Sequence, residues 1–241
     1  MNNFVVALAS MGKLLCRPIF PTRIIGERKL PSKKCLLVAN HLSGWDPVIF
    51  TMWMKGFKSF VYKADFENVP FLRWVFDGLE CIPVRRGEAD VNATKLILRQ
   101  LSADKNVVLF PEGTRNPDVD CLQPFRTGVA LFAIKTKSPI RPFYIWDRAK
   151  PFRRNYIIIG EEFTLEEYYD KPISKAVLEE ATEKVKQKVD ELRLKLNAIL
   201  SEKGVKRRKR KEKEVLKTKA YNARQKSFVQ SIQNKSDGGE L

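Results

Sequence analysis

The sequence is poor in the residues on which metal and disulfide chemistry depend. One histidine, His41, occurs in 241 residues, and the four cysteines lie far apart without a C-x-x-C pair. This spacing predicts free and mostly buried thiols rather than disulfides or metal ligands, and it suits a reducing cytoplasm. The chain also lacks the glycine-rich phosphate loops of nucleotide-binding proteins. We therefore expect no metal site and no nucleotide-dependent reaction.

A long apolar run is missing as well. The segment Phe4–Leu15 is the best candidate, but Lys13 interrupts it and it is shorter than the roughly 20 apolar residues that cross a bilayer. It ends at Arg17 and Pro18 without a small-residue cleavage site, so we expect no secretory signal. Its apolar residues recur at helical spacing. We predict an amphipathic helix within residues 1–20 that lies in the membrane interface, with packing on the protein core as the alternative.

Positive charge, in contrast, is abundant. The formal net charge is +17, and ten Lys or Arg stand between Lys203 and Ala220 against Glu212 and Glu214, a net of +8 in that stretch. We expect residues 201–241 to form a basic, poorly ordered tail. Charge alone does not choose between nucleic acid and an anionic lipid surface, near which each Lys or Arg contributes about 1 kcal/mol.

Apolar runs and helical patterns alternate along the body of the chain. This alternation predicts an α/β fold over residues 21–200, with a largely parallel central sheet flanked by helices. A long amphipathic C-terminal helix is expected over Ile173–Leu200, because its apolar residues recur at helical spacing. The other expected elements are strands at Cys35–Ala39, Ser59–Tyr62, Cys81–Val84, Val107–Phe110, Ile140–Trp146 and Tyr156–Ile159, and helices at 46–55, 70–78, 88–102 and 126–136.

His41 stands where an apolar strand passes into a loop, a common place for functional side chains. Asp46 follows five residues later, after a Ser-Gly pair that favours a tight reversal. Such a reversal can bring the carboxylate to one imidazole nitrogen and leave the other free as a general base near neutral pH. The same spacing has a structural alternative, in which Asp46 only caps the following helix.

A second group of polar residues follows the expected strand Val107–Phe110. Backbone N–H groups near Gly113, the hydroxyl of Thr114 and the guanidinium of Arg115 could bind an oxyanion such as phosphate. Arg86 follows another expected strand. Ligands of α/β folds tend to lie at the carboxyl ends of parallel strands, so we expect these groups to share one site with the histidine. Taken singly, the turn could be an ordinary one with a surface arginine.

The motifs, taken in order, resemble those of the glycerolipid acyltransferases, and most closely the 1-acylglycerol-3-phosphate acyltransferase branch. A lone H-x4-D is common by chance, but the ordered set is specific and covers about Ile24 to Tyr144. The matching segments are Asn40-His-Leu-Ser-Gly-Trp-Asp46 (NH-x4-D), Lys63-Ala-Asp65 with Pro70 and Ile82-Pro-Val-Arg-Arg86, Phe110-Pro-Glu-Gly-Thr-Arg-Asn116 (FPEGTRS type), Phe125-Arg-Thr-Gly128 (F-K-x-G) and Pro139-Ile-Arg-Pro142 (P-I-x-P).

The middle block departs from the family pattern at several positions. Asp65 replaces the usual Glu, Arg73 and Glu80 stand where glycines are common, and Arg85-Arg86 replaces Asp-Arg. These changes lie in the region expected to shape acceptor and acyl-chain binding. They bear on the substrate more than on the reaction.

The resemblance implies transfer of a fatty acyl group to the sn-2 hydroxyl of lysophosphatidic acid, giving phosphatidic acid. The donor is an acyl thioester on acyl carrier protein or coenzyme A, with no further cofactor and no acyl-enzyme intermediate. His41 is then the general base and Asp46 orients it. The other implied roles are loop orientation by Asn40, organisation of the arginines by Glu112, and phosphate binding by Arg86, Gly113, Thr114 and Arg115.

An enzyme of this kind is expected at an anionic membrane surface, on its cytoplasmic face, as a peripheral or monotopic protein. The enzymatic alternative is a related acyltransferase for glycerol 3-phosphate or another lysophospholipid, and the intact His41–Asp46 pair argues against an inactive family member. The non-enzymatic alternative is a basic nucleic-acid-binding protein. Nothing in the body of the chain resembles a nucleic-acid reader, so no specific nucleic acid is expected.

Overall fold

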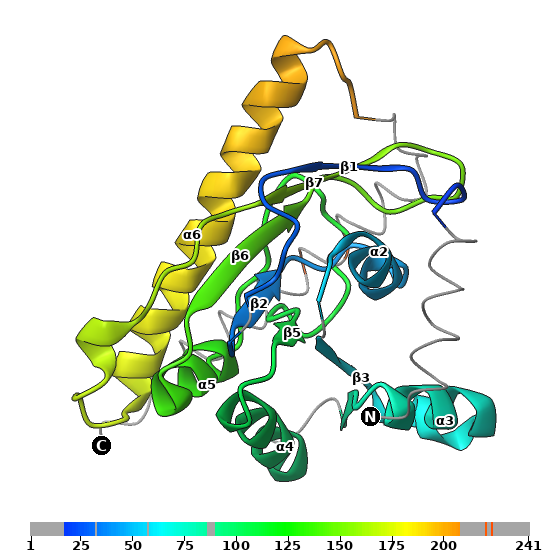
Figure 1. The fold of residues 1–241 in the computed structure, drawn as a ribbon. Helices are drawn as coiled ribbons and strands as arrows, with labels where there is room; N and C mark the ends of the chain where they lie inside the picture. Colours follow the sequence, from blue (N-terminus) through cyan, green and yellow to red (C-terminus); the bar gives the residue numbers. More distant parts are fainter. Residues whose placement is uncertain are drawn as a thin grey trace.

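A seven-stranded sheet forms the centre of the computed structural model, which describes residues 17–31, 33–56, 58–85, 90–207, 220 and 223 (Figure 1). The strand order is β1-β7-β6-β2-β5-β3-β4, and every neighbouring pair is parallel except β6 with β7. This confirms the predicted α/β class. The strands are β1 (Thr22–Ile25), β2 (Leu36–Ala39), β3 (Ser59–Lys63), β4 (Ile82–Val84), β5 (Val107–Leu109), β6 (Ile140–Ile145) and β7 (Asn155–Ile159).

The single antiparallel pair decides which loops meet at each edge of the sheet. Because β7 reverses direction and β1 runs parallel to it, the amino ends of β1 and β7 lie at the same edge as the carboxyl ends of β2 to β6. We call this the carboxyl edge. This arrangement brings segments that are distant in sequence to one side of the molecule. They are residues 17–21, 40–46, 110–116 and 146–154.

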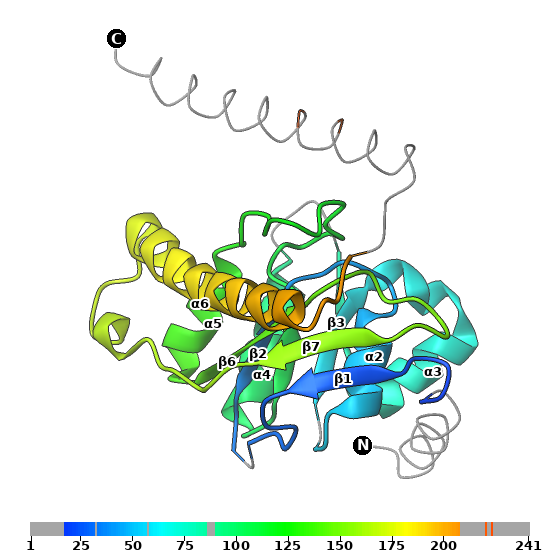
Figure 2. The same cartoon turned by 90° about the horizontal axis from the view of Figure 1, so that it is seen from above.

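Two apolar layers cover the sheet. Side chains alternate along a strand, so Leu36 and Val38 of β2 enter one core cluster, while Leu37 and Ala39 enter the other. The first cluster is closed by α4 (Val91–Ser102), α5 (Gly128–Thr136) and α6 (Lys175–Glu202), and the second by α2 (Asp46–Trp53). Figures 1 and 2 show α6 and α2 on opposite sides of the sheet.

The long helix α6 confirms the predicted amphipathic segment and closes the first core. Its start is capped by Ser174, whose hydroxyl accepts a hydrogen bond from the N–H of Val177 at 3.3 Å. The apolar stripe faces inward along the helix because it recurs at helical spacing. Its buried members are Ala181, Val185, Val189, Leu192, Leu196 and Leu200.

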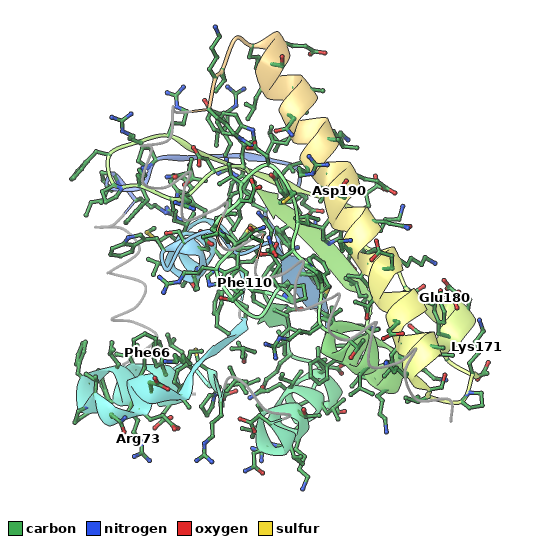
Figure 3. All side chains as sticks on the ribbon, turned by 180° about the vertical axis from the view of Figure 1, so that it is seen from behind. Phe66, Arg73, Phe110, Lys171, Glu180 and Asp190 are labelled. Atoms are coloured by element: carbon green, nitrogen blue, oxygen red, sulfur yellow. The ribbon has the colours of Figure 1, made fainter. Side chains whose placement is uncertain are left out.

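The smaller helices lie toward the periphery. They are η1 (Ala64–Asn68) and α3 (Pro70–Gly78), which follow β3, and η2 (Glu166–Tyr168), which precedes α6. Helix α3 buries only its last residue, and Figure 3 labels Phe66 and Arg73 on this outlying part. Among the residues described, no helix combines the length and the apolar character needed to span a bilayer.

The structure differs from the sequence-based expectation at two elements. Strand β1 was not predicted, and α4 begins at Val91 rather than at 88 because Asp90 caps it. Of the predicted N-terminal helix, residues 1–16 lie outside the described residues, and 17–20 form turns.

The C-terminal end of the folded domain was predicted at residue 200. Helix α6 continues to Glu202, and the chain then packs back on the domain through Arg207. The Arg207 guanidinium lies 5.2 Å from the Trp146 ring centroid and donates hydrogen bonds to Tyr144 and Asn197, each at 3.2 Å. Beyond Arg207 only residues 220 and 223 are described, so the predicted basic tail lies almost wholly outside the described residues.

Candidate active site

The loop after β2 is fixed to the neighbouring strand β6 through Asn40. Its amide Nδ2 donates to the carbonyl of Ile145 at 3.0 Å, and its Oδ1 accepts from the N–H of Ile145 at 2.7 Å. Asn40 is 1% exposed, so both ends of its amide serve the backbone rather than a ligand. The residue that follows, His41, therefore starts from a rigid position.

His41 and Asp46 meet across the predicted reversal. The Nδ1 atom of His41 lies 2.9 Å from Oδ2 of Asp46, which also accepts the backbone N–H groups of Leu42 and Ser43 at 2.7 Å each. A carboxylate accepts hydrogen bonds, so the proton of the neutral imidazole lies on Nδ1 and Nε2 carries the free lone pair. Asp46 opens α2, but its carboxylate serves the turn and the histidine, not a helix cap.

The ring of His41 is held by Phe110, the residue at the carboxyl end of β5. The two rings stack with centroids 4.5 Å apart and planes 28° apart. Figure 3 labels Phe110 near the middle of the sheet. His41 is 8% exposed, so the imidazole is largely shielded from water while its orientation is fixed from both sides.

The turn after β5 joins the His41 loop through its backbone. The N–H of Asn116 donates to the carbonyl of His41 at 2.6 Å. The Asn116 side chain in turn organises the following loop, since its Nδ2 donates to Cys121 O and its Oδ1 accepts from Asp118 N and Gln123 Nε2. The two motifs thus form one hydrogen-bonded unit at the carboxyl edge.

Two arginines converge on this unit. A carbon built onto Gly44 would stand 3.7 Å from Nη1 of Arg115, which places that guanidinium beside the His41–Asp46 turn. A carbon built onto Gly113 would overlap Nε of Arg126, so Arg126 lies directly over Gly113. Within the described residues neither arginine forms an ion pair, and both are exposed. Their charges are available to an anion.

Gly113 is required at its position for two reasons. Its φ is +68°, a backbone conformation that side-chain-bearing residues rarely adopt, and Arg126 occupies the space of a side chain. The N–H of Gly113 donates to Phe110 O at 3.0 Å, so it is engaged in the turn. The half-buried Thr114 lies between Gly113 and Arg115.

Glu112 is buried within the same turn and is 5% exposed. Burial raises the pKa of its carboxyl to about 8, outweighing the opposing effect of the Gln123 N–H, the Asn116 side chain and the His41 backbone. A carboxyl with this pKa is mostly neutral at pH 7. Among the described residues neither carboxyl oxygen of Glu112 has a hydrogen-bond partner, and no ion pair links it to an arginine, so its predicted role of organising the arginines stays a prediction.

Arg86 lies outside the described residues, so its predicted contact with the site stays a prediction. The preceding residue, Arg85, is described: its N–H donates to Asp90 Oδ2 at 2.8 Å. Strand β4 ends at the carboxyl edge, but β3 separates it from β5.

Sequence reasoning missed two residues of this arrangement. Phe110 and Arg126 both belong to matched motif segments, but neither was assigned a role. For Arg126 the sequence does contain a signal, because it is a cation within the motif segment Phe125–Gly128, like the arginines of the other segments.

The sequence model of the Acyltransferase family matches residues 21–146, which is more than half of the chain. The chain belongs to this family. The match runs from the start of β1 to the end of β6 and includes every described residue of the site.

Curated proteins give the same grouping for this acyltransferase chain. It is similar to a chloroplast 1-acyl-sn-glycerol-3-phosphate acyltransferase of Brassica napus, with 30% identity over 55% of this chain and 39% of the relative. The enzyme of that name from Haemophilus influenzae is 26% identical over 58% of this chain and 60% of the relative. A lyso-ornithine lipid O-acyltransferase of Pseudomonas aeruginosa is 28% identical over 54% and 50%. The chain thus spans about two fifths to three fifths of these relatives.

A solved structure supports the fold. The 1-acyl-sn-glycerophosphate acyltransferase from Thermotoga maritima superposes with a TM-score of 0.57 over 78% of each chain, at 21% sequence identity. At this identity the likeness concerns the fold alone.

Proposed function

We propose that this acyltransferase moves a fatty acyl group from an acyl thioester to the sn-2 hydroxyl of lysophosphatidic acid, giving phosphatidic acid. The observation that carries the proposal is the His41–Asp46 pair, which leaves Nε2 free in a turn that the exposed Arg115 approaches. The named activity of several relatives supports this choice of acceptor. The donor is a thioester of acyl carrier protein or coenzyme A.

The reaction begins at the acceptor hydroxyl. His41 Nε2 takes the hydroxyl proton as the oxygen attacks the thioester carbonyl, and the carbonyl oxygen becomes an oxyanion. The tetrahedral intermediate then collapses, the C–S bond breaks, and the leaving thiolate receives the proton from the imidazolium. Asp46 stabilises the imidazolium through the 2.9 Å contact at Nδ1.

Direct transfer is favoured because none of the described cysteines is suited to act as nucleophile. Burial raises the pKa of Cys35 to about 12 and that of Cys81 to about 11. The pKa of Cys121, a residue exposed on its loop, is raised to about 11 by partial desolvation and by the neighbouring Asp118. Thiols with such pKa values carry almost no thiolate at neutral pH, and the thiolate is the reactive form. The acyl group therefore passes to the acceptor without a covalent enzyme intermediate.

The acceptor phosphate is assigned to Arg115 and Arg126, with Thr114 and the turn at Gly113. A contribution of Arg86 to phosphate binding, as the sequence predicts, is part of the proposal. Guanidinium groups bind phosphate oxygens in pairs, and each such charged hydrogen bond contributes about 1.5–3 kcal/mol. The neutral Glu112 does not repel the phosphate. Asn40 acts by holding the loop, since its amide is used by Ile145.

Alanine at Arg115 or Arg126 is expected to raise the acceptor KM about tenfold or more, with a smaller effect on kcat. Steady-state kinetics with varied lysophosphatidic acid checks this. The matched control is Arg99→Ala on α4, an exposed arginine distant in sequence from the site, which should leave the acceptor KM unchanged. An effect confined to kcat would contradict the phosphate role.

An acceptor panel tests the substrate. Purified protein with acyl-ACP or acyl-CoA should show its highest kcat/KM with lysophosphatidic acid, and lower values with glycerol 3-phosphate and lysophosphatidylcholine. Glycerol 3-phosphate lacks the acyl chain of lysophosphatidic acid, and lysophosphatidylcholine carries choline on the phosphate. Absence of turnover with lysophosphatidic acid would overturn the proposal.

A second acceptor class is the lyso-ornithine lipids, which lack phosphate. The named activity of the Pseudomonas aeruginosa relative favours including it in the panel. A preference for this acceptor would leave the role of His41 as general base unchanged. It would contradict the assignment of Arg115 and Arg126 to an acceptor phosphate.

Both acceptor and product are lipids, so we place the enzyme at an anionic membrane surface, as a peripheral or monotopic protein on the cytoplasmic face. The net charge of +17 supports attraction to anionic lipids. Two weak signals together, an amphipathic segment and a polybasic segment, suffice for stable binding where one does not.

A further inference from the structure

The loop between β6 and β7, residues 146–154, combines several cations with a bare aromatic ring at the carboxyl edge. Phe152 is 78% exposed, more than any other large apolar side chain described. Lys150, Arg153 and Arg154 flank it in the sequence, and within the described ranges none of the three forms an ion pair. The loop thus presents an apolar ring together with positive charge.

The tip of this loop is fixed with the ring facing outward. Phe152 has a φ of +56°, which is uncommon for a bulky residue, and its N–H donates to the carbonyl of Ile19 at 2.5 Å. The first residue of β7 is bound to the same N-terminal segment, since the N–H of Asn155 donates to the carbonyl of Pro21 at 2.8 Å. Figures 1 and 2 show the loop beside residues 17–21. Strained backbone of this kind persists where the surroundings hold it, often at functional surfaces.

A chain of contacts connects the loop tip to the catalytic turn. Ile19 is followed by Phe20, whose ring centroid lies 5.0 Å from that of Trp45. Trp45 is part of the His41–Asp46 turn and is 48% exposed. At the other end of the loop, Arg148 donates to Pro117 O at 2.6 Å, next to the Asn116 turn. The loop tip and the catalytic turn are therefore joined through residues 19 and 20 at the carboxyl edge.

We propose that this face docks the domain on an anionic lipid bilayer. The docking surface consists of Trp45, Lys150, Phe152, Arg153 and Arg154. The assignment deepens the membrane association proposed above and rests on it. It locates the contact in the folded domain, where the His41 turn meets the lipid surface.

A bilayer matches both properties of the docking surface. Burial of the Trp45 and Phe152 rings at the boundary between headgroups and acyl chains is favourable, and the three loop cations face anionic headgroups. An acidic carrier protein would also match the cations. Binding of such a protein through its charges would not require the exposed Phe152 ring, whereas insertion into a bilayer uses it. A lipid acceptor in the leaflet would also enter the site from this side, next to Trp45.

The test measures partition of the full chain onto vesicles of phosphatidylcholine, with and without phosphatidylglycerol. At low salt the double reversal Arg153→Glu/Arg154→Glu should lower partition onto anionic vesicles at least about 30-fold, because two favourable charges are lost and reversed. The deficit should shrink at high salt. Phe152→Ser should lower partition onto both vesicle types about tenfold.

Matched controls carry the same changes elsewhere. Lys135→Glu/Lys195→Glu reverses two exposed cations on α5 and α6, and Leu194→Ser removes an apolar side chain that is 57% exposed on α6. These variants should bind vesicles like the wild type. Thermal unfolding of all variants verifies that they are folded, and turnover of a water-soluble short-chain acceptor should be unchanged.

The outcomes separate the docking surface from membrane association itself. If the wild type does not bind anionic vesicles at low salt, membrane association fails and the docking surface with it. If the wild type binds and both loop variants bind equally well, the docking surface is overturned while membrane association stands. If the charge reversal spares vesicle binding but weakens binding of acyl carrier protein, the surface serves the donor protein and the lipid assignment is overturned.

Discussion

Replacement of His41 by alanine is expected to lower kcat about 10²- to 10⁴-fold, the usual contribution of a general base. The reason is that Nε2 is the basic nitrogen left free to accept a proton, while Nδ1 is held by Asp46. Acyl transfer to lysophosphatidic acid, measured as thiol release, checks the change. Added imidazole should restore part of the lost rate, because the missing ring leaves a space beside Phe110.

The single histidine provides an independent control for this variant. Diethyl pyrocarbonate modifies imidazole, and His41 is the only one in the chain. Inactivation should follow modification of one histidine per chain and reverse with hydroxylamine. Wild-type turnover in a folded His41→Ala protein would remove the central mechanistic claim.

Asp46→Asn is expected to lower kcat by about 10²-fold or more with little change in either KM. The carbonyl oxygen of the new amide could still accept the N–H groups of Leu42 and Ser43, so the turn is kept. The negative charge beside His41 is lost, however, and with it the stabilisation of the imidazolium that forms in the transition state. Comparison of kcat and KM between wild type and variant checks this split.

Asp90→Asn is the matched control for the loss of a helix-end carboxylate. Asp90 also stands at a helix start and accepts two backbone N–H groups, from Ala93 at 2.9 Å and Arg85 at 2.8 Å. Asp90 faces no histidine. The kcat of the Asp90→Asn variant should therefore stay close to the wild-type value, while the thermal stability of the variant falls modestly. Equal losses of kcat in Asp46→Asn and Asp90→Asn would mean that Asp46 acts only through the fold.

The regular part of the fold could be predicted because its signals are local. Each buried strand is a short apolar run, and each run is followed by polar or glycine-containing turns. The His41–Asp46 contact was predictable for the same reason, since five residues of sequence contain the whole reversal. Helix α6 could be predicted from one apolar stripe.

The parts that escaped prediction depend on contacts between distant segments. Strand β1 has four residues, one of them the exposed Arg23, and its partner β7 lies about 130 positions later. The reversed direction of β7 has no signature in a run of isoleucines. The approach of Arg126 to Gly113 and the burial of Glu112 likewise arise only when the loops at the carboxyl edge are packed together.

The antiparallel step from β6 to β7 has a practical consequence. A parallel crossover must travel the length of the sheet, and its length is tied to the helix that it contains. The 146–154 connection instead turns back at the edge where it starts. Trp146 and Ala149 belong to the core, but residues can be added at the exposed tip, 151–154, without shifting strand register. This makes the loop a natural grafting position, at which foreign segments could be displayed within reach of the catalytic turn while the core stays as it is.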